Sequence, residues 1–260
     1  MAFFKYGDKN IYYDEIGVGL PVVLLHGDTA SSKMFEYIIP LYANSFRVIL
    51  MDFLGNGQSD RVKEFPSDLW YSQAQQVIAF LEYLDCGKVN LIGTSGGAWV
   101  AVNVALERPD LVYKVVADSF DGRTLQSGFS ENLLKERMTA KSNDFSRQFY
   151  EWCQGKDWEN VVDLNTKALV ECADSQLPLF HKPLETLEVP ILFVGSMEDT
   201  MCRKNLEEEY KQMEQLVSNG RTYLFPTGNH PAILTNAEKF ADIVNDFLIS
   251  KKLNKYGKPT

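Results

Sequence analysis

Short apolar runs alternate in this chain with longer segments of helical periodicity, and this alternation constrains the fold more than any other feature. Residues 21–25 (PVVLL) form a run that is apolar throughout and too short for a helix, as expected of a strand buried on both faces. Residues 69–84 carry apolar side chains three and four positions apart, which predicts a helix. Strands that alternate with helices indicate an α/β fold, in which a mostly parallel central sheet carries helices on both faces.

The same patterns predict the other elements of the sheet and its helices. Two strand-like runs surround the turn residues 8–10, so the chain is expected to begin with a hairpin. Ser31 and Ser32 are candidate N-caps for a helix that extends to about Leu41. The expected strands are 2–7, 11–17, 21–25, 46–51, 89–92, 112–117, 191–194 and 222–225, and the other expected helices are 69–84, 97–107, 203–218 and 237–248.

One long segment, residues 119–187, breaks the alternation. It is polar and helix-prone, which predicts a helical cap inserted between two parts of the core, residues 1–118 and 188–260. Reactive groups of a parallel sheet lie at the carboxyl ends of its strands, and we expect the cap to cover that edge. The alternative is a set of ordinary surface helices whose aromatic side chains pack in a local core. The aromatic residues in question are Phe145, Phe149, Tyr150, Trp152 and Trp158.

The charge balance and the chain ends exclude several classes of function. The formal net charge is −9 over 260 residues, whereas nucleic-acid binding needs clustered Lys and Arg, so we expect no nucleic-acid partner. No run approaches the roughly 18 to 20 apolar residues of a membrane helix, so no membrane insertion is expected. The first residues, MAFFKYGDKN, lack the features of a signal peptide, and we expect a cytoplasmic protein. Residues 251–260 are expected to form a solvated tail.

The cysteines give no indication of a metal site. Cys86, Cys153, Cys172 and Cys202 form no C-x-x-C pair, so we expect free thiols in a reducing compartment. The chain also lacks a Cys/His cluster with metal-ligand spacing and a G-x-G-x-x-G run after a strand. We therefore expect neither a metal nor an organic cofactor.

The strongest chemical signal is the run Gly93-Thr94-Ser95-Gly96-Gly97, between an expected strand and an expected helix. A serine at such a turn stands on a strained backbone that exposes its hydroxyl as a nucleophile. Small neighbours let the strand and the helix approach closely. A glycine-rich phosphate cradle at the helix start is the alternative. We identify Ser95 as the candidate nucleophile.

A serine hydroxyl needs a base, and the chain contains three histidines. In strand–turn–helix hydrolases of this kind the triad residues follow the order serine, acid, histidine. His181 and His230 come after Ser95, but only His230 follows an expected core strand. We identify His230 as the base, expect His181 to be structural or part of the cap, and expect His26 to organise its loop.

The base needs a carboxylate that fixes its tautomer. Glu198 and Asp199 are adjacent and follow the strand expected at 191–194. We prefer Asp199, because a shorter side chain has fewer rotamers to restrict. Glu198 stays open as the alternative, and Asp118, at the end of the preceding strand, is a third candidate.

Acyl transfer also requires donors that stabilise an oxyanion. Asp28 follows the first buried strand, and Gly96 follows the nucleophile. We predict that the backbone N–H groups of Asp28 and Gly96 converge on the developing charge, so that the identity of the Asp28 side chain matters little.

Five motifs together resemble the α/β-hydrolase superfamily over nearly the whole chain. They are LLHGDTASS, DFLGNGQSD, GTSGGAWVA, VGSMEDTM and GNHPAIL. The resemblance implies an α/β-hydrolase fold with a nucleophile elbow and a catalytic triad. The elbow carries Ser95 instead of an aspartate, so the resemblance should not extend to haloalkane dehalogenases or epoxide hydrolases. Gly96 stands where many relatives have Met or Gln, which should leave more room around the nucleophile.

These observations predict a serine hydrolase that acts on a small carboxylic ester with an apolar portion, by a Ser-His-Asp acyl-enzyme mechanism. One fold hosts many reactions, so hydrolysis of a thioester, lactone, amide or C–C bond is an alternative. Another is a hydrolase-like receptor for a small molecule, with little turnover. The substrate, the cap conformation and the oligomeric state cannot be read from these motifs.

Overall fold

The computed structural model describes residues 2–250, so the tail expected at 251–260 lies outside the described residues. Eight strands form one sheet in the order β1-β2-β4-β3-β5-β6-β7-β8. The first two strands pair antiparallel with their neighbours, and all the other pairs are parallel. The strands are β1 (Ala2–Tyr6), β2 (Lys9–Ile16), β3 (Leu20–Leu25), β4 (Phe46–Met51), β5 (Val89–Thr94), β6 (Val112–Asp118), β7 (Ile191–Ser196) and β8 (Gly220–Phe225).

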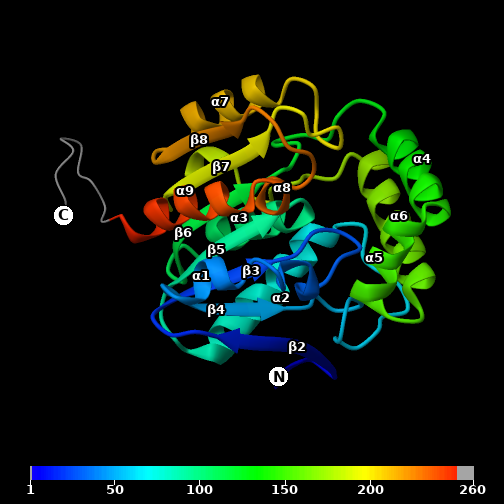
Figure 1. The fold of residues 1–260 in the computed structure, drawn as a ribbon, viewed down its shortest axis with the longest axis horizontal. Coiled ribbons are helices and arrows are strands. Elements are labelled where there is room, and N and C mark those ends of the chain that lie inside the picture. The colour runs from blue at the N-terminus through cyan, green and yellow to red at the C-terminus, as the bar shows by residue number, and fades with distance from the viewer. Residues whose placement is uncertain (1, 251–260) are drawn as a thin grey trace.

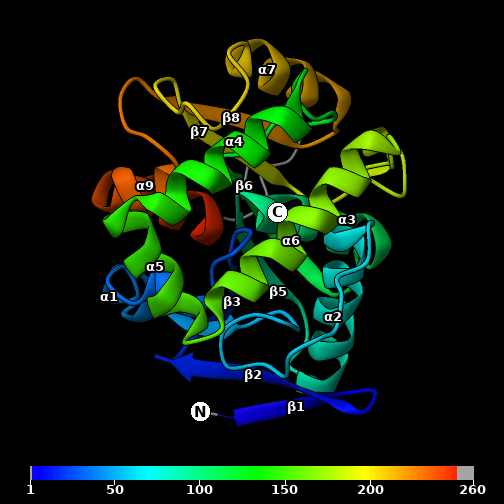
Figure 2. The same ribbon diagram turned by 90° about the vertical axis from the view of Figure 1, so that its right-hand side faces the viewer.

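Helices cover both faces of this sheet, as Figures 1 and 2 show. One face carries α2 (Leu69–Leu84), α3 (Gly96–Glu107) and α7 (Leu206–Leu216). The other carries α1 (Pro40–Ala43), α8 (Ala232–Thr235) and α9 (Ala237–Ile249). The predicted α/β fold class is therefore confirmed.

The core consists of two apolar layers separated by the sheet. Successive side chains of a strand point to opposite faces. In β3, Val23 and Leu25 accordingly pack under α2 and α3, whereas Val22 and Leu24 pack under α9. Burial on both faces explains why β3 is apolar at each of these positions.

The helix expected to extend to about Leu41 is wrong as a single element. A 3₁₀ turn at Ser32–Phe35 and the short α1 take its place. Pro40 has no N–H to donate within a continuous helix. Ser31 makes no capping bond, because its hydroxyl donates to the Cys153 carbonyl at 3.0 Å.

Three helices lie together over the carboxyl ends of the parallel strands (Figure 2): α4 (Phe129–Ser142), α5 (Asp144–Gln154) and α6 (Trp158–Asp174). Gln154 connects this layer to the core. Its side chain accepts from the Gly57 N–H at 2.7 Å and donates to the Ala30 carbonyl at 2.7 Å. We propose that residues 119–187 form a cap, with the core boundaries as expected above. None of the helices between residues 2 and 250 is both long and apolar enough to span a bilayer.

Candidate active site

Ser95 lies at the turn between β5 and α3, with φ 54° and ψ −125°. A positive φ is strained for a residue with a side chain, and two hydrogen bonds hold this conformation. The Ser95 N–H donates to the Asp118 carbonyl at 2.8 Å, and the Ser95 carbonyl accepts from the Ala98 N–H at 2.9 Å. A Cβ at Gly93 would lie 2.0 Å from the Gly97 carbonyl oxygen. The glycines are therefore required for the close approach of strand and helix.

His230 and Asp199 meet Ser95 from two other strand ends. Asp199 follows β7, and His230 follows β8 in the loop before α8. The Nε2 atom of His230 lies 3.0 Å from Ser95 Oγ, and its Nδ1 atom lies 2.8 Å from Asp199 Oδ2. The structure thus brings together the nucleophile, base and acid that the sequence predicts, at hydrogen-bonding distance.

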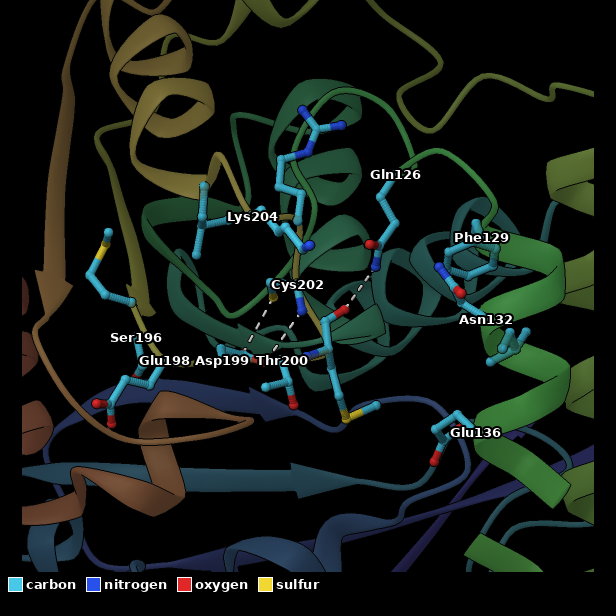
Figure 3. Close-up of a pocket in the computed structure, with 15 residues that line it drawn as sticks. Gln126, Phe129, Asn132, Glu136, Ser196, Glu198, Asp199, Thr200, Cys202 and Lys204 are labelled. Atoms are coloured by element: carbon cyan, nitrogen blue, oxygen red, sulfur yellow. Dashed lines mark hydrogen bonds between the residues drawn. The ribbon is translucent and has the colours of Figure 1, made fainter. Parts of the chain in front are cut away.

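The two adjacent acids have different surroundings. The Asp199 side chain is fully buried, whereas Glu198 is exposed and accepts the Gly228 N–H at 3.3 Å. In Figure 3 the Glu198 side chain points away from Cys202, whose N–H and thiol donate to Asp199. This geometry favours Asp199 over Glu198 as the partner of His230.

Electrostatics couples Asp199 to His230. Burial alone would raise the pKa of Asp199, but the hydrogen bond and charge of His230, together with the hydrogen bonds from Met201 and Cys202, hold that pKa below its usual value. Burial alone would lower the pKa of His230, but the hydrogen bond and charge of Asp199, with the charges of Asp118 and Asp121, raise it above its usual value. The pair therefore stabilises an imidazolium, as a general base requires.

Asp118, the third candidate acid, is fully buried and has other partners. It accepts from the Thr94 hydroxyl at 2.7 Å, the Ser119 hydroxyl at 2.9 Å and the Ile233 N–H at 3.2 Å. Burial raises its pKa to about 6. These bonds connect the ends of β5 and β6 to the start of α8, next to Ser95.

The two predicted oxyanion donors lie beside Ser95. Among the described residues, none accepts a hydrogen bond from the backbone N–H of Asp28 or Gly96, so both donors are free. A Cβ at Gly27 would lie 2.9 Å from Ser95 Cβ, which brings the loop after β3 against the nucleophile.

The expectation of extra room beside Gly96 is wrong. A Cβ at Gly96 would lie 2.5 Å from Asp28 Oδ2 and 2.7 Å from Oδ1. The carboxylate of Asp28 occupies this space, held by the Trp70 indole N–H at 3.2 Å from each oxygen and by the Asn165 amide at 3.5 Å.

The other two histidines lie apart from this chain of hydrogen bonds. His26 is 1% exposed, and its Nδ1 lies 2.8 Å from the Gly27 carbonyl, which makes this nitrogen the donor. Its Nε2 accepts the Phe53 N–H at 3.1 Å, so His26 joins the loops after β3 and β4. His181 is exposed and stacks on Tyr71 with 3.4 Å between ring centroids.

A cavity of about 500 Å³ opens onto Ser95 and His230 between the core and the helices above. Phe145, Phe149 and Tyr150 of α5 line it, in agreement with an apolar pocket under these helices. Trp152 and Trp158 do not line it. Trp158 packs on Tyr150 in a cluster formed within the segment, so it has the local packing role of the alternative interpretation. Trp152 instead stacks on Tyr37, which lies outside the segment.

Asp199, Cys202 and His230 each offer a ligand atom within 4.8 Å of the others, a grouping that could hold a metal ion. Their present contacts fit a different role. Asp199 Oδ2 faces both the His230 Nδ1 atom and the Cys202 thiol, and His230 Nε2 faces Ser95. Because these groups are hydrogen-bonded to one another, we interpret the cluster as the base and its support.

A family model described as the alpha/beta hydrolase fold matches residues 21–157, which include Ser95. The chain belongs to the alpha/beta hydrolase family. This match, together with a hydrolase relative that covers 95% of the chain, shows that the chain is a hydrolase.

Two relatives of this alpha/beta hydrolase match along nearly its whole length. The chain is 25% identical over 268 residues to 2-hydroxy-6-oxo-6-(2'-aminophenyl)hexa-2,4-dienoic acid hydrolase from Metapseudomonas resinovorans, covering 95% of the chain and 90% of the relative. A solved structure, described as a serine hydrolase involved in carbazole degradation, is 25% identical with a TM-score of 0.76. That comparison covers 95% of this chain and 97% of the other.

A third relative corrects an expectation. A haloalkane dehalogenase from Mycolicibacterium paratuberculosis is 32% identical over 112 residues, or 42% of this chain and 37% of the relative. The likeness therefore does extend to a dehalogenase over part of the chain, although residue 95 is a serine here.

Sequence reasoning missed several residues of this hydrolase cavity. Trp70 and Trp99 line it and stack on one another with 4.2 Å between centroids. Arg137 of α4 also lines it and is 8% exposed. Trp70 stands at the first turn of α2 and Trp99 at the first turn of α3, so both helix starts lie at the active edge. Their position at the expected helix starts is the feature of the sequence that could have identified them as cavity residues.

Proposed function

We propose that this hydrolase cleaves a small carboxylic ester with an apolar portion, through an acyl-enzyme on Ser95. The observation that carries the proposal is the chain of contacts from Ser95 Oγ to His230 Nε2 (3.0 Å) and from His230 Nδ1 to Asp199 Oδ2 (2.8 Å). Nucleophile and base within hydrogen-bond reach, with the base oriented by a third group, is the arrangement that activates a serine.

In the proposed reaction, Ser95 Oγ attacks the ester carbonyl carbon while His230 Nε2 takes the hydroxyl proton. The free N–H groups of Asp28 and Gly96 stabilise the oxyanion. His230 then gives its proton to the leaving alcohol, and Asp199 stabilises the imidazolium between these steps. In the second half, His230 takes a proton from water as the water oxygen bonds to the acyl carbon. His230 then gives that proton to Ser95 Oγ as the ester bond to Ser95 breaks, which releases the acid and restores the hydroxyl and the neutral imidazole. The scheme needs no cofactor.

A fluorophosphonate probe tests the nucleophile directly. The wild type should become labelled and Ser95→Ala should not, and turnover of p-nitrophenyl esters of increasing acyl length should follow the same pattern. Thioester, lactone and amide panels run beside the esters identify the bond. Labelling without turnover on any panel would favour the small-molecule receptor over the enzyme.

Hydrolysis of a C–C bond is the second candidate. It is favoured by the relative from Metapseudomonas resinovorans, which covers 95% of this chain and is named for a dienoic acid substrate. Incubation with that named acid decides between the two: loss of the acid together with inactivity on every ester would replace the ester proposal.

A cytoplasmic location remains a prediction.

A further inference from the structure

The carboxylate of Asp28 points to a charged feature of the substrate. Its two oxygens lie only 2.5 and 2.7 Å from where a Cβ of Gly96 would stand, and the N–H of Gly96 is a proposed oxyanion donor. A carboxylate at this place opposes the negative charge that develops on a neutral ester. An ester that brings its own positive charge removes that conflict.

The hydrogen bonds of Asp28 leave it capacity for a further donor. A carboxylate has about four acceptor positions. Its donors among the described residues are neutral, the Trp70 indole at 3.2 Å and the Asn165 amide at 3.5 Å, and both distances are long for hydrogen bonds to a carboxylate. No described cation is hydrogen-bonded to it. Burial raises the pKa of Asp28, and the charge of Arg137 opposes that shift.

Trp70 is itself held in place. It stacks on Trp99, whose indole N–H donates to the Gly122 carbonyl at 2.8 Å. The Asp28 carboxylate is thus supported by packed aromatic rings on α2 and α3, a preorganised arrangement that suits recognition.

The charge of the cavity has the same sign as Asp28. Among the described side chains that line it, the carboxylates are those of Asp28, Asp121 and Glu136, against one guanidinium, that of Arg137. Arg137 already has Glu136 Oε2 at 3.1 Å and the Tyr150 hydroxyl at 2.8 Å from its Nη1. The aromatic rings of the cavity add faces that attract a cation.

We propose that Asp28 is a specificity-determining residue that binds a protonated amine on the acyl part of the substrate, a few atoms from the scissile carbonyl. The inference rests on the proposed function, because it places the amine relative to an ester held at Ser95. It goes beyond that function, because it gives the Asp28 side chain the role of binding a positively charged group of the substrate. The proposed reaction uses only the backbone N–H of Asp28.

Three methyl esters of similar shape test the charge: methyl 3-aminopropanoate (cationic), methyl butanoate (neutral) and monomethyl succinate (anionic). Methanol release by the wild type should give a kcat/KM for the amine about tenfold to a hundredfold above that for butanoate, as expected for one hydrogen bond to a charged group. The succinate ester should be the poorest of the three.

Asp28→Asn should bring the ratio of amine to butanoate close to one, while it retains the backbone N–H at position 28. Asp121→Asn is the matched control, because it removes a charge from the same cavity. The Asp121 oxygens already accept the N–H groups of Gln126 and Arg203, at 3.0 and 2.7 Å, so the ratio should stay within about twofold of the wild type. Thermal unfolding of both variants checks that they are folded.

Binding to Ser95→Ala keeps this test independent of turnover. Calorimetry should show the amine ester binding more tightly than butanoate, and the double variant with Asp28→Asn should lose the difference. Equal binding of the two esters, or an amine preference that survives Asp28→Asn, would overturn the inference while leaving probe labelling of Ser95 intact. A preference for the succinate ester would overturn it in favour of Arg137. If the wild type were not labelled by the fluorophosphonate probe, that result would instead contradict the proposed function.

Discussion

The hydrogen bonds of Asp199 predict what an asparagine at this position does to the base. Asp199 Oδ1 accepts the N–H groups of Met201 at 2.9 Å and Cys202 at 3.3 Å, and Oδ2 faces His230 Nδ1 at 2.8 Å. An asparagine places its oxygen at the Oδ1 position, because only an acceptor satisfies two N–H groups, so its NH₂ group faces Nδ1. That group donates to Nδ1 and moves the imidazole proton to Nε2, which can then no longer accept the proton of Ser95.

Asp199→Asn should therefore lose activity because His230 has the wrong tautomer, while the protein stays correctly folded. Asp199→Asn is expected to lower kcat by roughly 10²- to 10⁴-fold, the upper figure being that measured when a buried triad aspartate is replaced in a serine protease. This corresponds to about 3 to 5 kcal/mol of transition-state stabilisation. Steady-state kinetics on the best p-nitrophenyl ester measures the effect, and thermal unfolding shows that the variant is folded.

Glu198→Gln is the matched control, one residue away on the same loop. Its exposed carboxylate contacts a backbone N–H at 3.3 Å and lies on no path to His230, so the loss should be less than about tenfold. A larger loss in Glu198→Gln than in Asp199→Asn would refute the tautomer argument and move the acid to Glu198. Near-normal activity in both variants would point to Asp118.

Three further expectations concern the nucleophile, the base and the cap. Ser95→Ala should lower kcat by about 10⁴-fold or more without loss of fold, and wild-type turnover in that variant would remove Ser95 from the mechanism. His230 must be neutral to accept a proton, and its pKa is raised, so kcat/KM should rise with pH through a midpoint above the ordinary value of about 6.5. A profile that stays flat from about pH 5 to 9, with chemistry limiting, is incompatible with a histidine base. Replacing residues 119–187 with a short linker should change ester preference more than probe labelling, because α5 lines the cavity and Ser95 is held by the core; an unchanged ester profile would mean that the cap does not select the substrate.

The strands and the elbow could be predicted because their signals are local. β3 is buried on both faces and is apolar from Val22 to Leu25, and α2 begins and ends at the residues where the helical period does. The elbow needs Gly93 within two residues of Ser95, so its requirement is visible in five consecutive letters.

The segment after β3 could not be predicted, because its partners are far away in the sequence. The Ser32 N–H donates to Asp52 Oδ1 at 2.7 Å, and the Ser31 hydroxyl donates to the Cys153 carbonyl 122 residues further on. Both serines have the residue type of an N-cap, but tertiary partners replace the capping bond. The choice between Glu198 and Asp199 has the same origin, since it depends on a loop that turns one carboxylate toward a histidine 31 residues away.

The pair of Gly96 and Asp28 shows why the negative charge of the cavity could not be predicted from the sequence. Each position is unremarkable by itself: a small residue after the nucleophile, and a loop residue expected to matter only through its N–H. In the structure they share one volume, because a Cβ at Gly96 would lie 2.5 Å from Asp28 Oδ2. A larger residue at 96 would have to displace the carboxylate, and so the absence of a side chain at one strand end permits a charge from another. The sign of the potential beside the proposed oxyanion site therefore depends jointly on two residues 68 positions apart, and it cannot be read from motifs considered one strand at a time.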